Sequence, residues 1–283
     1  MYEISVKLKN NLTADDCELL VELGYALEKG TTFEQDLKTA FKLYYEAAYL
    51  GDKRGINNLA WMHLNGYGTP QDTDKAIELF EVSASEGDDL AMVNLGNIYE
   101  NTKYGKQDSK KAFEWYKNSV EHGNVGAGMF NLANCYHNGF GTHKNYKKAF
   151  ELFSDLVELE YDNANFYLGL YYQNGHYVKK DYKKAIKYYL KGVAVDDKYC
   201  YNQLGVMCAK GLGMEKNLTA AMSCYTKAAE LGDYLGYTNL AWFYETGNAV
   251  EKDMPKAIEY YLIAAQHDEQ NAIDALTRLN VRC

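Results

Sequence analysis

Apolar and polar positions along the chain repeat with a period of about 36 residues. Leucines that are each followed at once by Gly or Ala recur at spacings of 36, 36, 37, 36, 36 and 36 residues, and an alanine lies 17 residues after each leucine. These leucines are Leu23, Leu59, Leu95, Leu132, Leu168, Leu204 and Leu240. Because two independent markers keep one register, the pattern predicts seven copies of a single structural unit.

Each unit predicts two helices joined by a turn. With the leucine as position 0, apolar or small residues fall at −4, 0, +1, +3 and +4, the spacing of one helix face. Gly at +7 in six of the seven units ends this first helix, and Asp or Asn at +13 in every unit caps the second. Because no unit could bury its apolar face alone, we expect an all-α fold in which seven helix pairs stack into a right-handed α/α solenoid.

The two ends of the chain depart from the repeat. Residues 1–14 precede the first unit, and their alternating apolar positions suggest a short strand or an extended lead-in. The repeats occupy residues 15–269. Residues 270–283 begin like another first helix and then stop, which predicts a C-terminal capping helix.

Two of the units resemble a known repeat family. The unit at Leu59, LAWMHLNGYGTPQDTDKAIELFEVSASEGD, and the unit at Leu204, LGVMCAKGLGMEKNLTAAMSCYTKAAELGD, are similar to the Sel-one-like repeat (SLR) family, a relative of the tetratricopeptide repeats. The resemblance extends over about residues 18–269. It implies an α/α solenoid that binds proteins or peptides as an adaptor or scaffold, with no shared catalytic residues.

One branch of that family is secreted, and disulfides clamp its neighbouring helices. This chain departs from that branch, because Cys200 stands at the matching position but its partner position holds Val193. The six cysteines are scattered, without any C-x-x-C pair, so we expect reduced and mostly buried thiols.

In tetratricopeptide-like superhelices the first helices line the concave surface, so the polar face of these helices is the predicted groove. Asparagine recurs there although it is a mediocre helix former, with two tryptophans beside it. The predicted groove residues are Tyr25, Asn58, Trp61, Asn65, Asn94, Asn97, Asn101, Asn131, Asn134, His137, Asn138, Tyr167, Asn174, Asn239 and Trp242.

Two interpretations of this asparagine ladder remain open. The carboxamides can offer donors and acceptors to the backbone of an extended peptide, while the tryptophans anchor it. Alternatively, the asparagines bond to one another or to adjacent helices and brace the stack. For the ladder as a whole we favour the binding groove.

Charge and hydropathy exclude several classes of partner. The net charge of −9 and a pI near 5.2 disfavour binding to nucleic acid or to an anionic membrane surface, both of which need clustered cations. No apolar run approaches the roughly 18 residues of a spanning helix, and the N-terminus has no secretory-signal core. We therefore expect a cytoplasmic protein, unless a targeting segment was removed. The sequence does not indicate an oligomeric state.

The stretch NLANCYHNGFGTH has the composition of a metal or thiol–imidazole site. The repeat register separates its members, because Cys135 falls on the core face, His137 on the groove face, and His143 in the turn beyond the helix. No nucleotide-binding, hydrolase or metalloprotease motif occurs elsewhere. We therefore expect neither an enzyme nor a metal or cofactor site.

The leading functional prediction is a protein–protein interaction module that grips a peptide segment or a protein partner in the concave groove. The alternative is an inhibitory or immunity-type protein that covers a toxin or enzyme, since an acidic surface would steer a basic target.

Overall fold

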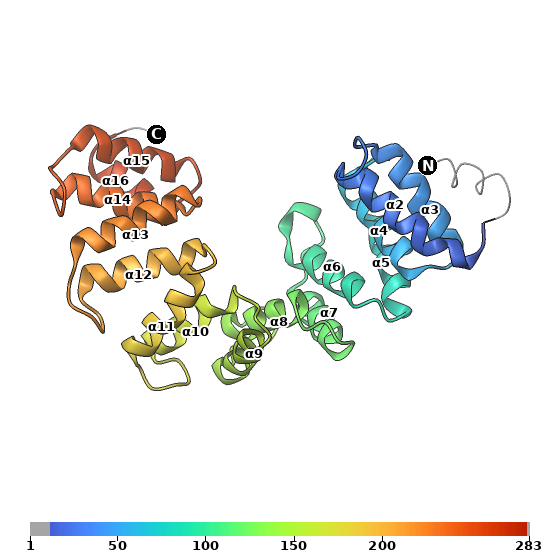
Figure 1. Ribbon diagram of the computed structural model, residues 1–283, viewed down its shortest axis with the longest axis horizontal. Coiled ribbons are helices and arrows are strands. Elements are labelled where there is room, and N and C mark those ends of the chain that lie inside the picture. The colour runs from blue at the N-terminus through green and yellow to red at the C-terminus, as the bar shows by residue number, and fades with distance from the viewer. Residues whose placement is uncertain (1–11, 282–283) are drawn as a thin grey trace. The chain divides into compact units, whose positions relative to one another are not determined.

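The computed structural model describes residues 12–281, and within this range the fold is all-α, with no strand (Figure 1). The first helices of the repeats are α2 (Cys17–Lys29), α4 (Lys53–Asn65), α6 (Asp89–Glu100), α8 (Ala127–Asn138), α10 (Ala164–Asn174), α12 (Lys198–Lys210) and α14 (Tyr234–Thr246). The second helices are α3 (Leu37–Tyr49), α5 (Thr73–Ser85), α7 (Ser109–Glu121), α9 (Tyr146–Glu158), α11 (Tyr182–Val193), α13 (Leu218–Glu230) and α15 (Met254–Ala265). The chain also forms α16 (Gln270–Arg278) and the 3-10 helices η1 (Ala14–Asp16) and η2 (Thr102–Tyr104). The predicted strand of the N-terminal lead-in lies outside the described residues.

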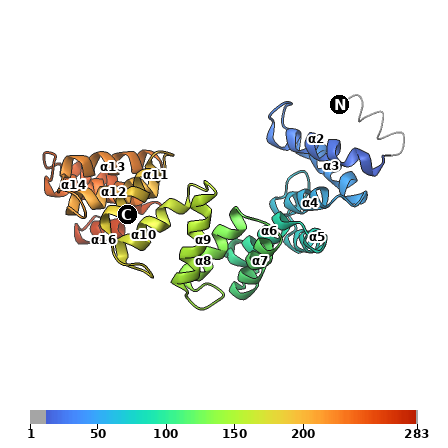
Figure 2. The ribbon, with the colours of Figure 1, turned by 60° about the horizontal axis from the view of Figure 1, so that its bottom comes forward.

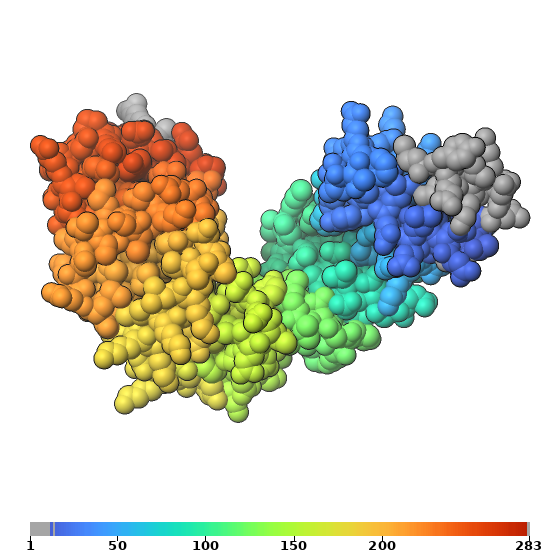
Figure 3. Space-filling view, viewed as in Figure 1, coloured from blue at the N-terminus to red at the C-terminus, as the bar shows by residue number. Residues whose placement is uncertain are grey.

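The helices form two compact units, Met1–Asn145 and Tyr146–Cys283, whose boundary falls inside the fourth repeat. Within each unit, a first helix packs on its own second helix, and that second helix packs on the next first helix. Some first helices of consecutive repeats also touch directly, namely α2 with α4, α6 with α8 and α10 with α12, and α14 touches α16 in the same way. Figure 2 shows α12, α13 and α14 as such a stack, and Figure 3 shows the consecutive layers of the second unit in contact. The predicted all-α solenoid of helix pairs is thereby confirmed.

The turn residues adopt the conformations that the sequence predicts. Gly66 has φ 70° at the end of α4, where its N–H donates to the carbonyl of Met62. The Asp72 carboxylate then caps α5 by accepting from the backbone N–H of Lys75. The same left-handed glycine ends a first helix in six repeats, and the same Asp or Asn side chain caps at least six second helices.

The third repeat, which lacks the glycine at +7, ends its first helix differently. Helix α6 stops at Glu100, and the side chain of Asn101 accepts from the N–H of Lys103 to start η2. Gly105, with φ 66°, then ends η2. A short 3-10 turn therefore replaces the left-handed cap.

Large rings on the second helices fill the space between the two helices of each repeat. The position 21 residues after the marker leucine holds Tyr or Phe throughout and is buried in every repeat. A methyl group added to Gly205 would lie 2.6 Å from a ring carbon of Tyr225, so glycine at +1 is what lets this ring approach.

Four of these buried tyrosines donate their hydroxyl to an acidic or amide side chain at position +5 of the same repeat. The pairs are Tyr44 with Glu28 (3.0 Å), Tyr116 with Glu100 (2.6 Å), Tyr189 with Gln173 (2.8 Å) and Tyr261 with Glu245 (2.9 Å). Where the ring is Phe80 or Phe153, position +5 is Leu64 or His137. The hydrogen bond satisfies a phenol that would otherwise be buried without a partner.

Helix α16 covers the end of the last repeat. It packs on α15 and α14, and buries Ala272, Ala275 and Leu276. The Arg278 guanidinium reaches back to Glu245 on α14, with an ion-pair distance of 2.7 Å.

Candidate functional site

The predicted groove residues all lie on first helices or at their ends, and none of the fifteen is buried. The marker leucines on the opposite face of the same helices are buried or partly buried. The predicted groove residues are thus exposed or partly exposed, on the face opposite the marker leucines.

In the first unit, four predicted residues meet in one pocket between α4 and α6. The pocket has a volume of about 560 Å³, and its lining includes Trp61, Asn94, Asn97 and Asn101. Leu64 and Ile98 add apolar surface. An aromatic wall beside several carboxamides is suited to a peptide that presents both an apolar side chain and backbone polar groups.

In the second unit, Asn239 and Trp242 of α14 line two pockets. One, of about 400 Å³, also involves α12 and α13, and the other, of about 380 Å³, involves α15 and α16. The Trp242 side chain is 46% exposed and belongs to the walls of both pockets. It is therefore placed as an aromatic anchor for a ligand on this face.

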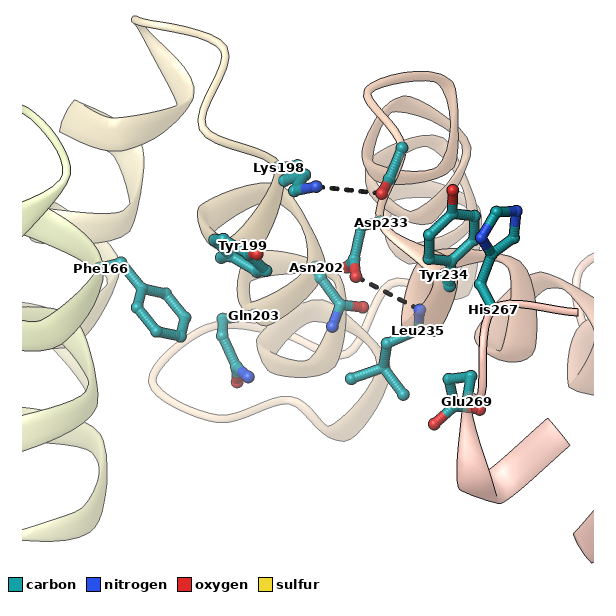
Figure 4. Close-up of a pocket in the computed structure, with 11 residues that line it drawn as sticks. Phe166, Lys198, Tyr199, Asn202, Gln203, Asp233, Tyr234, Leu235, His267 and Glu269 are labelled. Atoms are coloured by element: carbon teal, nitrogen blue, oxygen red, sulfur yellow. Dashed lines mark hydrogen bonds between the residues drawn. The ribbon is translucent and has the colours of Figure 1, made fainter. Parts of the chain in front are cut away.

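A further pocket of about 460 Å³ contains residues that the sequence analysis did not name. Figure 4 shows Tyr199, Asn202 and Gln203 on α12, opposite Tyr234 and His267, whose rings stack with centroids 3.8 Å apart. The repeat register places Tyr199 and Gln203 on the groove face, so the sequence period could have identified these two residues. His267 comes from the turn after α15 and departs from the repeat, so no periodic signal identified it.

A buried carboxylate lies in the wall of this pocket. Asp233 is 7% exposed and accepts from the N–H of Leu235 over 3.3 Å, while its other oxygen, Oδ2, has no hydrogen-bond partner within residues 12–281. Burial raises the pKa of Asp233, and the nearby charge of Lys198 opposes that rise. The Lys198 ammonium itself donates to the carbonyl of Gly232 over 3.1 Å (Figure 4).

Several asparagines brace the stack. Asn94 Nδ2 donates to Asn57 Oδ1 over 3.0 Å, which joins α6 to α4. Asn239 Nδ2 donates to Asn202 Oδ1 over 2.8 Å and joins α14 to α12 in the same way. The bracing interpretation therefore holds for these side chains, and the sequence analysis did not name Asn57 and Asn202, their acceptors.

Other predicted residues differ in what they contact. Asn131 donates to Asn97 over 3.3 Å, and Asn65 donates to the carbonyl of Trp61 over 2.9 Å. Asn134 Oδ1 is a buried acceptor with no hydrogen-bond partner in the described part of the chain. The remaining predicted residues that no pocket above contains are Tyr25, Asn58, His137, Asn138, Tyr167 and Asn174.

The cysteine and histidines of NLANCYHNGFGTH are distributed as the register predicts. Cys135 is 2% exposed, and burial raises the pKa of its thiol to about 12. His137 is partly exposed on α8, and His143 is exposed in the turn that follows. Across residues 12–281 no cluster of three or more His, Cys, Asp or Glu side chains could hold a metal ion. Nor is any helix there both long and apolar enough to cross a membrane.

Stacked helix pairs with a polar and aromatic first-helix face define this protein as an α-solenoid. The model of the Sel1 repeat matches seven segments, and the chain belongs to this family, whose members generally mediate protein–protein interactions. The matched residues are 18–52, 54–88, 89–124, 126–154, 162–194, 198–233 and 235–269.

Two solved structures show the same fold. One is a protective antigen of uropathogenic Escherichia coli with an SLR fold, 25% identical with a TM-score of 0.72 over 95% of this chain and 59% of that one. The other is a Sel1 repeat protein from Oxalobacter formigenes, 23% identical with a TM-score of 0.71 over 93% of this chain and 76% of that one. The chain therefore spans less than two thirds of the antigen's length. No curated protein gives a significant sequence match.

Proposed function

We propose that this protein is a non-enzymatic interaction module, which binds a peptide segment or a protein partner on the face lined by its first helices. The observation that carries the proposal is the position of the two tryptophans. Trp61 and Trp242 each line a pocket on this face, one in each unit, beside asparagines of the same face.

The physical basis is that hydrogen bonds fix the first helices relative to one another, while aromatic side chains on the same face stay exposed. Asn57 and Asn202 hold neighbouring first helices together through carboxamide pairs, so the adjacent pockets are preformed. A preformed pocket costs little ordering entropy on binding, and an aromatic side chain inside it contributes much of the binding free energy.

Affinity capture from the native host, followed by mass spectrometry, tests the proposal. Trp61→Ala with Trp242→Ala should lose the partners that the wild-type chain captures. The matched control is Tyr45→Ala with Leu190→Ala, two exposed side chains on second helices, which should keep them. Equal capture by both double variants, with folding checked by circular dichroism, would contradict binding on this face.

The same capture separates two modes of action. Several partners held together would indicate a scaffold. A single stoichiometric enzyme, silenced on binding, would indicate the inhibitory alternative, which the acidic net charge of −9 allows for a basic target.

A further inference from the structure

The seven repeats can be compared position by position. At position +5 the sixth repeat lacks the Glu or Gln that pairs with the buried tyrosine in four other repeats. Four repeats pair the buried tyrosine at +21 with Glu or Gln at +5. The sixth repeat keeps the tyrosine as Tyr225 but holds Ala209 at +5. The hydroxyl of Tyr225 therefore lacks the acceptor that its counterparts have.

The structure places an open pocket where that acceptor is missing. Tyr225 is 4% exposed, and its hydroxyl has no hydrogen-bond partner among residues 12–281. Tyr225 and Ala209 both line the pocket of about 400 Å³ that also contains Trp242. The hydroxyl is not among the fully buried polar atoms without a partner, so it opens onto this pocket and can donate a hydrogen bond to an acceptor that a ligand places there.

The charges at this pocket favour an anionic acceptor. Lys210 and Lys216 line it, and neither lysine makes an ion pair within the described part of the chain. Two lysines thus line this pocket in a chain of net charge −9. A carboxylate satisfies both kinds of group, since it accepts the phenolic hydrogen bond and pairs with an ammonium.

The seventh repeat shows the completed arrangement. There Tyr261 donates to Glu245, and Lys252 helps to lower the pKa of that carboxyl, after the larger effects of Arg278 and Tyr261. Lys252 and Lys216 occupy the same repeat position, +12. The sixth repeat thus has the tyrosine and the lysine of the seventh without the glutamate.

We propose that the pocket beside Ala209 receives a glutamate side chain of the partner protein, whose carboxylate takes the place that the chain's own Glu or Gln occupies in four other repeats. This inference rests on the proposed function and adds the chemistry that the partner presents. The exposed ring of Trp242 forms the adjacent wall, so the residues flanking the glutamate contact it.

A stability measurement tests the geometry independently of any partner. Ala209→Glu should raise the midpoint of urea unfolding, because it supplies the missing acceptor, whereas Tyr225→Phe alone should change it little. In the double variant the gain should disappear, because the added carboxylate has lost its donor. A gain that survives Tyr225→Phe would overturn the assigned geometry.

A binding measurement tests the occupant. Random 12-residue peptides displayed on phage are selected on the full wild-type chain, and the affinity of the best peptide is measured by fluorescence anisotropy. The selected peptides should share a glutamate whose change to glutamine weakens binding tenfold or more. Ala209→Glu should abolish binding, and Lys216→Gln should weaken it severalfold.

The outcomes separate this inference from the proposed function. Peptides that bind and are lost on Trp61→Ala, but are indifferent to Ala209→Glu, would overturn the glutamate pocket and leave the interaction face standing. Failure to select any peptide or capture any partner would contradict both. Equal affinity for N-acetylglutamate amide and for the peptide would overturn the assignment to a protein partner, because it would indicate a site for a small free carboxylate.

Discussion

The hydroxyl of Tyr44 donates a hydrogen bond of 3.0 Å to Glu28, a carboxylate that is only 6% exposed. This pair ties the second helix of the first repeat to its first helix. Tyr44→Phe should lower the free energy of unfolding by about 1–3 kcal/mol, because the buried Glu28 Oε2 loses this donor while Oε1 keeps its ion pair with Lys29. Urea denaturation followed by circular dichroism measures the loss.

The control for this variant is Tyr225→Phe, which removes the same atom from a ring without a hydrogen-bond partner in the described residues. Its free energy of unfolding should stay close to that of the wild type. Similar losses in the two variants would mean that the hydrogen bond to Glu28 contributes little.

The second prediction concerns pH and the contact between α16 and α14. Hydrogen bonds from Arg278, and then from Tyr261, hold the pKa of Glu245 below its usual value of about 4.5. A carboxyl with a lower pKa in the folded state stabilises the fold above its unfolded pKa, and this contribution is lost as pH falls through the folded value. Arg278→Leu should therefore destabilise the protein at pH 7 and differ progressively less from the wild type below about pH 4.5.

Thermal unfolding of both proteins between pH 7 and pH 3 measures this difference. Lys227→Leu is the control, because Lys227 belongs to an exposed pair with Glu230 at 3.9 Å and should show a much smaller pH-dependent difference. A destabilisation by Arg278→Leu that is the same at pH 3 and pH 7 would contradict a role for the ionised Glu245.

The third prediction concerns a left-handed turn. Glu160 follows α9 with φ 59°, where four other repeats have Gly51, Gly87, Gly123 and Gly232. A non-glycine residue in this region is strained by about 1–2 kcal/mol. Glycine removes the strain, but it loses more conformational entropy on folding, which offsets part of the gain in stability. Glu160→Gly should therefore raise the free energy of unfolding by up to about 1 kcal/mol.

The reverse substitution provides the control. A methyl group at Gly87 would meet nothing within 4 Å, so Gly87→Ala isolates the effect of its φ of 76° and should be destabilising. The same urea titration serves both variants. If Glu160→Gly were as destabilising as Gly87→Ala, strain at this turn would not be the cause.

The fourth prediction concerns thiol reactivity. Cys135 and Cys200 are 2% and 0% exposed, and burial raises the pKa of both thiols. Only a thiolate is an effective nucleophile, so neither residue should react with iodoacetamide at pH 8 in the native protein. Mass mapping of alkylated peptides measures this, with the protein in denaturant as the fully reactive reference. Rapid native alkylation of Cys135 would contradict its place in the core.

The periodic parts of the structure were predictable because each repeat supplies its own local signals. Gly66 could be assigned to a helix end and Asp72 to a helix start from their spacing, because these roles depend on the backbone within a few residues. The faces of the first helices followed from the same register, so the exposure of Trp61 and Trp242 could be predicted as well.

What the sequence did not reveal depends on contacts between repeats. The bond from Asn94 to Asn57 requires the distance between α6 and α4, which periodicity does not specify. The pocket around His267 likewise depends on a residue outside the repeat pattern. The missing acceptor at Ala209 was visible in the sequence, but its meaning required the hydrogen bonds of the other repeats.

Within each unit, the major contacts of every described helix are with helices one or two places away along the chain. A pulling force applied to the ends of such a unit would therefore meet no described contact that all its repeats share, and the repeats would unfold one after another. Each repeat that gives way would lengthen the chain by roughly 120 Å of contour, since about 36 residues extend at 3.3–3.6 Å each. Under load, such a protein would therefore extend in steps of equal length, one step for each repeat that unfolds.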